Sequence, residues 1–136
     1  MAQANGVEHR LITGSFCDDA VLQSLPLSRH ALVLNDCEGY EKTLFTPETV
    51  RTLTKHDVLI EVHDFVDLAI SAKLRAVFET THHLEIITSF DDVKKAQTYD
   101  YPELATFDLT QRKILLAEYW ASIMEWFYFS PRVISA

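Results

Sequence analysis

Two short runs of apolar residues, each ending abruptly in polar and acidic residues, constrain the fold more than any other feature of the sequence. Residues 31–34 (ALVL) are followed by Asn-Asp-Cys-Glu-Gly at 35–39, and residues 58–62 (VLIEV) are followed by His63 and Asp64. Continuous rather than alternating apolarity is typical of parallel strands, which are covered on both faces. We therefore expect two buried parallel strands whose carboxyl ends carry polar side chains.

Helix signals follow each of these strands. Thr46 and Pro47 have the residue types of an N-cap and a first helical position, which predicts a helix over 46–55. A second helix is expected from Asp64 or Asp67 to about residue 79, before a third strand at 83–89. Strands that alternate with helices imply right-handed crossovers. The sequence thus predicts a single α/β domain over 1–136, with a partial Rossmann-like, mostly parallel sheet flanked by helices.

The two ends of the chain carry further expected elements. Near the N-terminus we expect a strand over 9–16 (HRLITGSF) and a short helix over 19–25. Toward the C-terminus the pattern loosens over 90–109, where we expect little regular structure, and a helix is expected over 110–120. Residues 123–130 (IMEWFYFS) predict a last strand. Because the connection before this strand is short, we expect it to be antiparallel to its neighbour.

Charge and composition exclude several classes of protein. The chain has 136 residues, with 20 acidic and 12 basic residues and a net charge of −8. Such a surface repels phosphate backbones and anionic lipids, so we expect no nucleic-acid or membrane partner. No apolar run approaches the roughly 20 residues of a membrane span, and the first residues do not resemble a secretory signal. Two cysteines form no disulfide framework, which favours a reduced, cytoplasmic protein.

The polar residues that follow the two buried strands are the first candidates for a site. Ligands of open α/β sheets bind beyond the carboxyl ends of the strands, and adjacent strands lie about 4.8 Å apart. The two clusters should therefore face each other across one cleft. Carboxylates with a histidine can bind a hard divalent cation or shift one another's pKa for acid/base work. From sequence alone we assign no metal ligand, and the predicted catalytic residues are Asp36, Glu38, His63 and Asp64, with Asn35 and Glu61 beside them.

Three other features favour structural roles. His82 and His83 begin a strand, which places them at the amino-terminal edge of a parallel sheet, away from the expected site. The aromatic residues Trp120 and 126–129 favour core packing over substrate stacking. Cys37 lies between two acidic residues, which disfavour its thiolate, so we do not expect a nucleophile there.

Several segments of the sequence resemble one enzyme family. The segments VLNDCEGYE, DVLIEVHDF and FETTHHLEII resemble the fourth, fifth and sixth strands of class I S-adenosylmethionine-dependent methyltransferases, together with the residues that border them. MEWFYFSPR resembles the seventh strand, which in that fold inserts antiparallel between the fifth and the sixth. ANGVEHRLITGSF is similar to the region that leads into the third. The resemblance implies that this chain is the C-terminal half of such a sheet.

The resemblance also implies which residues border a cofactor. Asn35 and Asp36, at the end of the fourth strand, would border S-adenosylmethionine and the methyl acceptor, and Glu38 and His63-Asp64 would line the same pocket. The family binds the cofactor chiefly through a glycine-rich turn after its first strand and an acidic residue that ends its second. The three glycines here form no G-x-G-x-x-G motif. We therefore expect no cofactor in the isolated chain, and S-adenosylmethionine only if a missing half is supplied.

A methyltransferase sheet without its first two strands leaves residues 31–34 with a bare edge. Exposed edges invite association, so we expect either that 9–16 moves beside 31–34 or that two chains form a homodimer. The expected function is a methyltransferase-like fragment that acts mainly by self-association or partner binding. The alternative is a small enzyme, metal-assisted or completed by another chain, that uses the acidic cleft.

Overall fold

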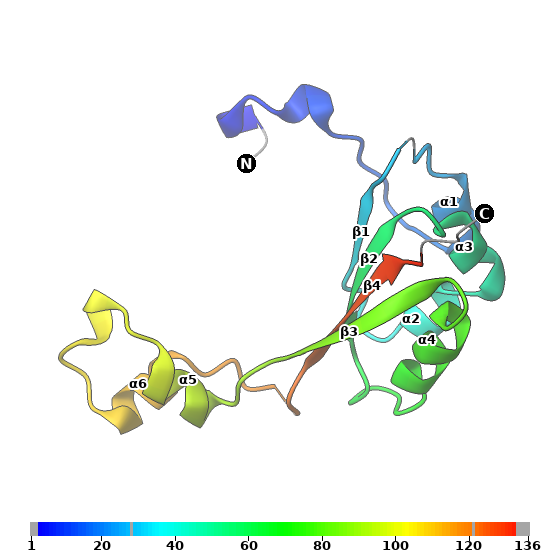
Figure 1. The fold of residues 1–136 in the computed structure, drawn as a ribbon. Coiled ribbons are helices and arrows are strands. Elements are labelled where there is room, and N and C mark those ends of the chain that lie inside the picture. Colours follow the sequence, from blue (N-terminus) through cyan, green and yellow to red (C-terminus); the bar gives the residue numbers. More distant parts are fainter. Residues whose placement is uncertain (1–2, 28, 121, 133–136) are drawn as a thin grey trace.

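A computed structural model, which describes residues 3–27, 29–120 and 122–132, is built around a four-stranded mixed sheet (Figure 1). The outermost residues of the predicted domain over 1–136 lie outside the described ranges. The strands are β1 (Leu32–Asn35), β2 (Asp57–Val62), β3 (His82–Thr88) and β4 (Glu125–Pro131). Their order across the sheet is β1-β2-β4-β3.

The last strand lies between two strands that precede it in the chain. β1 and β2 are parallel, whereas β4 is antiparallel to both β2 and β3. The predicted α/β class and the antiparallel C-terminal strand are confirmed. The sheet is not mostly parallel, because β4 separates β2 from β3, which run in the same direction and would otherwise pair.

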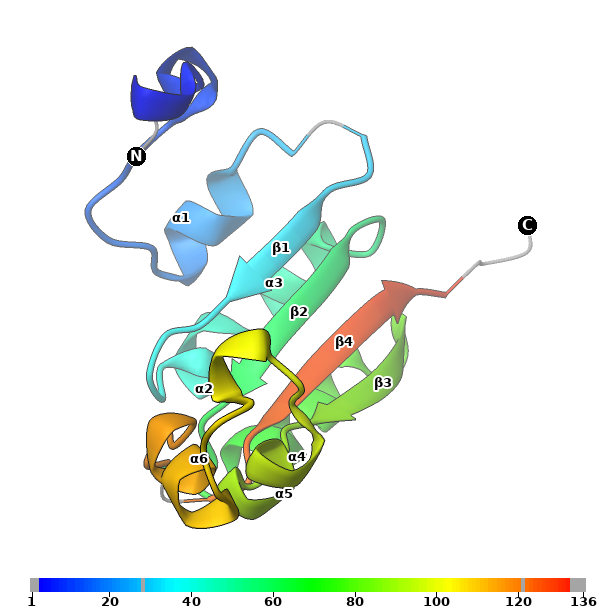
Figure 2. The ribbon, with the colours of Figure 1, turned by 90° about the vertical axis from the view of Figure 1, so that its left-hand side faces the viewer.

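Four helices cover one face of this sheet (Figures 1 and 2): α1 (Asp19–Ser24), α2 (Glu41–Leu44), α3 (Pro47–Thr52) and α4 (Ile70–Phe78). The side chain of Asp18 caps α1 by accepting a hydrogen bond from the Val21 amide at 2.8 Å, and Thr46 caps α3 in the same way at the Thr49 amide. The predicted helix over 46–55 ends earlier, at Thr52. The short helix α2 was not expected.

The hydrophobic core fills the space between the sheet and these helices. Val58 and Ile60 of β2 lie beside Phe127 and Phe129 of β4, all fully buried. The ring of Phe78 stacks on that of Phe129, with centroids 4.0 Å apart and planes 14° apart. The expected core packing of the aromatic strand is therefore confirmed for its two phenylalanines.

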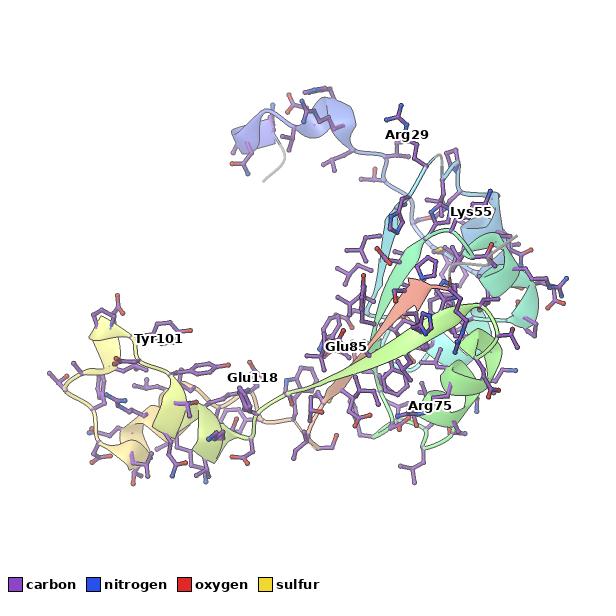
Figure 3. All side chains as sticks on the ribbon, viewed as in Figure 1. Arg29, Lys55, Arg75, Glu85, Tyr101 and Glu118 are labelled. Atoms are coloured by element: carbon purple, nitrogen blue, oxygen red, sulfur yellow. The ribbon has the colours of Figure 1, made fainter. Side chains whose placement is uncertain are left out.

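On the opposite face of the sheet, the described residues form no helical layer. The register places Leu34, Leu59, Tyr128 and Glu85 in one row across this face, and Figure 3 shows Glu85 on the side of the sheet away from Arg75 of α4. The exposed fractions of Leu32 and Leu34 are 60% and 63%. The expectation that residues 31–34 are buried on both faces is therefore wrong, because the described helices α1 to α4 all lie on one side.

The N-terminal segment does not form the strand expected over 9–16. Residues Gln3–Asn5 and Glu8–Arg10 form single 3-10 turns, and residues 11–16 have no regular structure and are exposed. A strand is stable only beside a partner, and no strand of the described chain pairs with this segment. The expected repair of the bare edge of β1 from within the chain is therefore wrong.

The segment between β3 and β4 projects away from the sheet as an arm (Figure 1). It contains α5 (Asp92–Thr98), a 3-10 turn at Pro102–Leu104 and α6 (Leu109–Leu115). The expectation of little regular structure over 90–109 is wrong, because the Asp91 side chain caps α5 at the Lys94 amide. The helix expected over 110–120 ends at Leu115. Among the described residues no helix has the length and apolarity needed to cross a membrane.

Candidate functional site

A tight turn after β1 brings acidic side chains back toward the end of β2. The Tyr40 amide donates to the Cys37 carbonyl at 3.2 Å, which closes the turn. Glu38 has a φ of 53° and Gly39 a φ of 100°. A positive φ is uncommon for a residue other than glycine, and such conformations concentrate at functional sites. A Cβ at Gly39 would lie 2.8 Å from Cγ1 of Val66, so glycine is also required by the close approach of that loop.

His63, the first residue after β2, is fully buried and hydrogen-bonded to a buried carboxylate. Its Nδ1 pairs with Oε1 of Glu41, the first residue of α2, and both side chains have no exposed surface. The same Glu41 oxygen accepts from the Gly39 amide at 3.3 Å. An ionised carboxylate can only accept, so Glu41 requires a hydrogen on Nδ1 of His63. When the ring is neutral, the lone pair is then on Nε2.

The Nε2 atom of His63 faces the two carboxylates of the turn. It lies 3.6 Å from Oδ1 of Asp36 and 3.4 Å from Oε2 of Glu38, whose side chains are 52% and 70% exposed. Nε2 is itself buried and has no hydrogen-bond partner. The three potential ligand atoms lie within 4.8 Å of one another. We call Asp36, Glu38 and His63 the acidic–histidine cluster.

The surroundings of the acidic–histidine cluster are strongly negative. Burial and then the charge of Asp36 raise the pKa of the neighbouring Glu61, with a smaller contribution from Glu38. Burial, followed by the charge of Glu41, raises the pKa of the Cys37 thiol to about 11. In the described part of the chain no lysine or arginine forms an ion pair with any carboxylate of the cluster, with Glu41 or with Glu61. The site therefore lacks cationic side chains to balance its charge.

The structure brings together three of the four predicted catalytic residues. Asp36, Glu38 and His63 share one cluster, but the carboxylate of Asp64 accepts from the Ser71 amide at 2.9 Å and stabilises the start of α4. Asp64 and His63 are adjacent, so their side chains diverge from the end of the strand. Glu41 was missed, because the four residues of α2 are too few to give a periodic pattern.

The residues expected to border a cofactor line a groove along the outer edge of β1. The groove has a volume of about 490 Å³, and its lining includes Asn35 and Asp36, residues 15–17, and Leu22 of α1. The Asn35 side-chain oxygen accepts from the Cys37 thiol at 3.3 Å. Of the three glycines, Gly6 and Gly14 have open space where a Cβ would be, and Gly39 packs against Val66.

His82 has a structural role at the opposite end of the sheet. It is buried, its Nε2 donates to the His56 carbonyl at 3.1 Å, and its Nδ1 lies 2.8 Å from the Thr81 hydroxyl. Burial lowers its pKa, which favours the neutral ring. His82 begins β3, whereas His63 follows the end of β2, and these two strands run in the same direction. His82 therefore lies far from the acidic–histidine cluster.

Comparison with known proteins gives no matching family model, no similar curated protein and no similar solved structure.

Proposed function

We propose that this chain is a methyltransferase-like α/β domain that corresponds to the C-terminal half of a class I S-adenosylmethionine-dependent methyltransferase sheet. The observation that carries the proposal is the reversed β4 between β2 and β3. The resemblance implied an antiparallel seventh strand between the fifth and the sixth, and the order β1-β2-β4-β3 agrees with strands four, five, seven and six. The acidic residues after β1 add support, because they lie where that fold places acceptor-binding groups.

Under this proposal the acidic–histidine cluster is on the acceptor side of the cleft. Asp36 and Glu38 are exposed enough to contact a bound molecule, while Glu41 fixes the ring of His63. We expect the chain alone not to bind S-adenosylmethionine, since its three glycines form no G-x-G-x-x-G motif. If another polypeptide supplies the N-terminal half of the sheet with its glycine-rich turn, the cofactor would enter the groove beside Asn35 and Asp36.

Self-association is the second part of the proposal. The outer edge of β1 pairs with no strand of the described chain, and Leu32 and Leu34 expose most of their side chains beside it. A second copy that packs on the open face beside this edge would cover both leucines by a two-fold interface. The partners we propose are thus a second copy and a small-molecule substrate, without nucleic acid or membrane. We also propose a cytoplasmic location, which the two free thiols support.

The association is tested by light scattering on a size-exclusion column. We expect a homodimer that becomes more stable as salt is added, because each copy has a net charge of −8. Replacing Leu34 by lysine on the edge strand should give a monomer with an unchanged circular dichroism spectrum, whereas Leu115→Lys on the arm serves as a control with a similarly exposed leucine. A wild-type chain that remains monomeric at high concentration contradicts the dimer.

The methyltransferase relation is tested by calorimetry with S-adenosylmethionine. We expect no binding to the chain alone, and binding to a chimera that carries the first three strands of a class I methyltransferase ahead of β1. The control is the same chimera with the glycines of its glycine-rich turn replaced by alanine. Micromolar binding by the chain alone, or no binding by a chimera that unfolds cooperatively, would contradict the proposal.

A further inference from the structure

We propose that Asp36, Glu38 and His63 form a binding site for one divalent transition-metal ion. The inference goes beyond the methyltransferase proposal and does not depend on it. It starts from Nε2 of His63, a buried nitrogen with no hydrogen-bond partner. A buried polar atom without a partner costs about 1–3 kcal/mol, and native structures seldom retain one without a reason. A metal ion in the cluster would satisfy this atom.

The position of the ring hydrogen favours metal binding. In the neutral ring, whose Nδ1 hydrogen is donated to Glu41, the lone pair of Nε2 is directed toward the oxygens of Asp36 and Glu38. A lone pair that faces two negatively charged oxygens is repelled, and a metal ion bound between these atoms relieves the repulsion while leaving the ring neutral. No described lysine or arginine forms an ion pair there, so a bound metal ion would remove the repulsion.

The spacing of the three atoms is that of ligands around one ion. Two ligands that each lie about 2.1 Å from a metal, at a tetrahedral angle, are about 3.4 Å apart. The distances from Nε2 to Glu38 and to Asp36 are 3.4 and 3.6 Å. All three potential ligand atoms lie within 4.8 Å of one another. Because the side chains of Asp36 and Glu38 are exposed, their carboxylates can move closer together. The buried ligand is fixed, and the two exposed ligands can adjust.

Glu41 is the group that orients the histidine ligand. Metal-binding histidines usually donate their second ring hydrogen to a carboxylate or a carbonyl, which fixes the ring and raises the basicity of the ligand nitrogen. The buried pair of Glu41 and His63 has this arrangement. The same Glu41 oxygen accepts from Gly39, so the turn that carries Glu38 and the ring of His63 are held by one side chain.

The ligand types indicate which ions fit. Imidazole favours Zn²⁺ and its neighbours in the first transition row, whereas carboxylate oxygens also suit Mn²⁺. Mg²⁺ retains its waters and takes mainly oxygen ligands, so it should bind more weakly here. Three protein ligands are the number found in catalytic zinc sites, where a remaining position is open to water or substrate. Since Asp36 and Glu38 are exposed, that open position would face solvent.

Calorimetry on chelator-treated protein tests this site with Zn²⁺, Mn²⁺ and Mg²⁺, and visible absorption reports Co²⁺ coordination. We expect one Zn²⁺ per chain, weaker Mn²⁺ binding, still weaker Mg²⁺ binding, and a Co²⁺ spectrum that Zn²⁺ abolishes. Asp36→Asn and Glu38→Gln should each weaken Zn²⁺ binding at least tenfold and should fold normally, because both side chains are exposed. Glu103→Gln on the arm is the matched control and should bind as the wild type does.

Two further variants test separately the group that orients His63 and the two carboxylate ligands. Glu41→Gln should weaken Zn²⁺ binding about 10–100-fold without removing a ligand. The combined Asp36→Asn and Glu38→Gln variant should lose the Co²⁺ spectrum. No Zn²⁺ or Co²⁺ binding by the wild type up to about 1 mM would overturn the proposal, since so weak a site is not specific. Binding that persists unchanged in the double variant would overturn it as well, because the ion would then occupy other histidines.

Discussion

The buried pair of Glu41 and His63 allows a quantitative test of how the site is held together. Both side chains are fully buried, and Glu41 provides the acceptor for Nδ1 of His63 and for the Gly39 amide. Replacement of Glu41 by alanine leaves both donors unpaired in the interior. Each buried donor left without a partner costs about 1–3 kcal/mol, so two together cost about 2–6 kcal/mol. We expect Glu41→Ala to lose an amount in this range.

The conservative variant separates the contribution of the charge from that of the hydrogen bonds. Glu41→Gln retains an oxygen that accepts from His63 and Gly39, so we expect it to lose only about 1–2 kcal/mol. For a chain of 136 residues, an unfolding entropy of about 2.1 cal/mol/K per residue converts the alanine loss to a fall in Tm of about 7 to 21 °C. The glutamine variant should lose less than half as much.

Urea unfolding followed by circular dichroism measures these losses, with metal removed by a chelator so that only folding energetics is compared. Glu103→Ala on the arm is the control and should stay within about 0.5 kcal/mol of the wild type, as an exposed side chain does. If Glu41→Ala unfolds within about 1 kcal/mol of the wild type, the pair is not the buried, mutually dependent unit described above.

Three further outcomes are expected. Burial lowers the pKa of His82, so as the pH falls this histidine is protonated in the unfolded chain before it is protonated in the folded chain. Its contribution to stability is therefore present above about pH 6.5 and is lost as the pH falls below that value. Urea unfolding at pH 7.5 and 5.5 should show the loss of stability, and His82→Gln should make that loss smaller. With a pKa of about 11, the Cys37 thiol is about one-thousandth thiolate at pH 8. Iodoacetamide should therefore label the exposed Cys17 faster than Cys37, as measured by peptide mass spectrometry. Gly39→Ala should cost about 1–3 kcal/mol in thermal unfolding, because the residue has a positive φ and its new Cβ would meet Val66; an unchanged Tm would contradict that geometry.

Strands with strong local patterns were predicted best. The four strands expected at 31–34, 58–62, 83–89 and 123–130 are found within one or two residues of their predicted ends. Each is a run rich in apolar or β-branched residues that ends at polar residues or proline. The strand expected at 9–16 is absent because strand formation depends on a neighbour, which a local pattern cannot reveal. The open face of β1 was missed for the same reason, since apolarity shows what a strand could bury but not what covers it.

The sequence predicted those site residues that the topology of the sheet alone brings together. Asp36, Glu38 and His63 follow parallel neighbouring strands, so their proximity follows from the rule for strand ends. Glu41 could not be inferred, because its burial depends on a four-residue helix and on the turn at Glu38 and Gly39. Asp64 was predicted to be a catalytic residue, but its carboxylate turns toward the start of α4. The sequence does not reveal which of these two directions the side chain takes.

The arm has a consequence for how the chain folds and how it can vary. Thr88, the last residue of β3, pairs directly with Glu125, the first of β4, so the whole arm is a long connection within one antiparallel hairpin. Loop-closure entropy grows slowly, by about 0.6 kcal/mol for each doubling of length, so the sheet tolerates an arm of almost any size. Trp120 at its base contacts Phe65, whose ring packs on His63. Insertions or deletions in this hairpin could therefore alter the wall beside the acidic–histidine cluster while the register of the four strands is preserved.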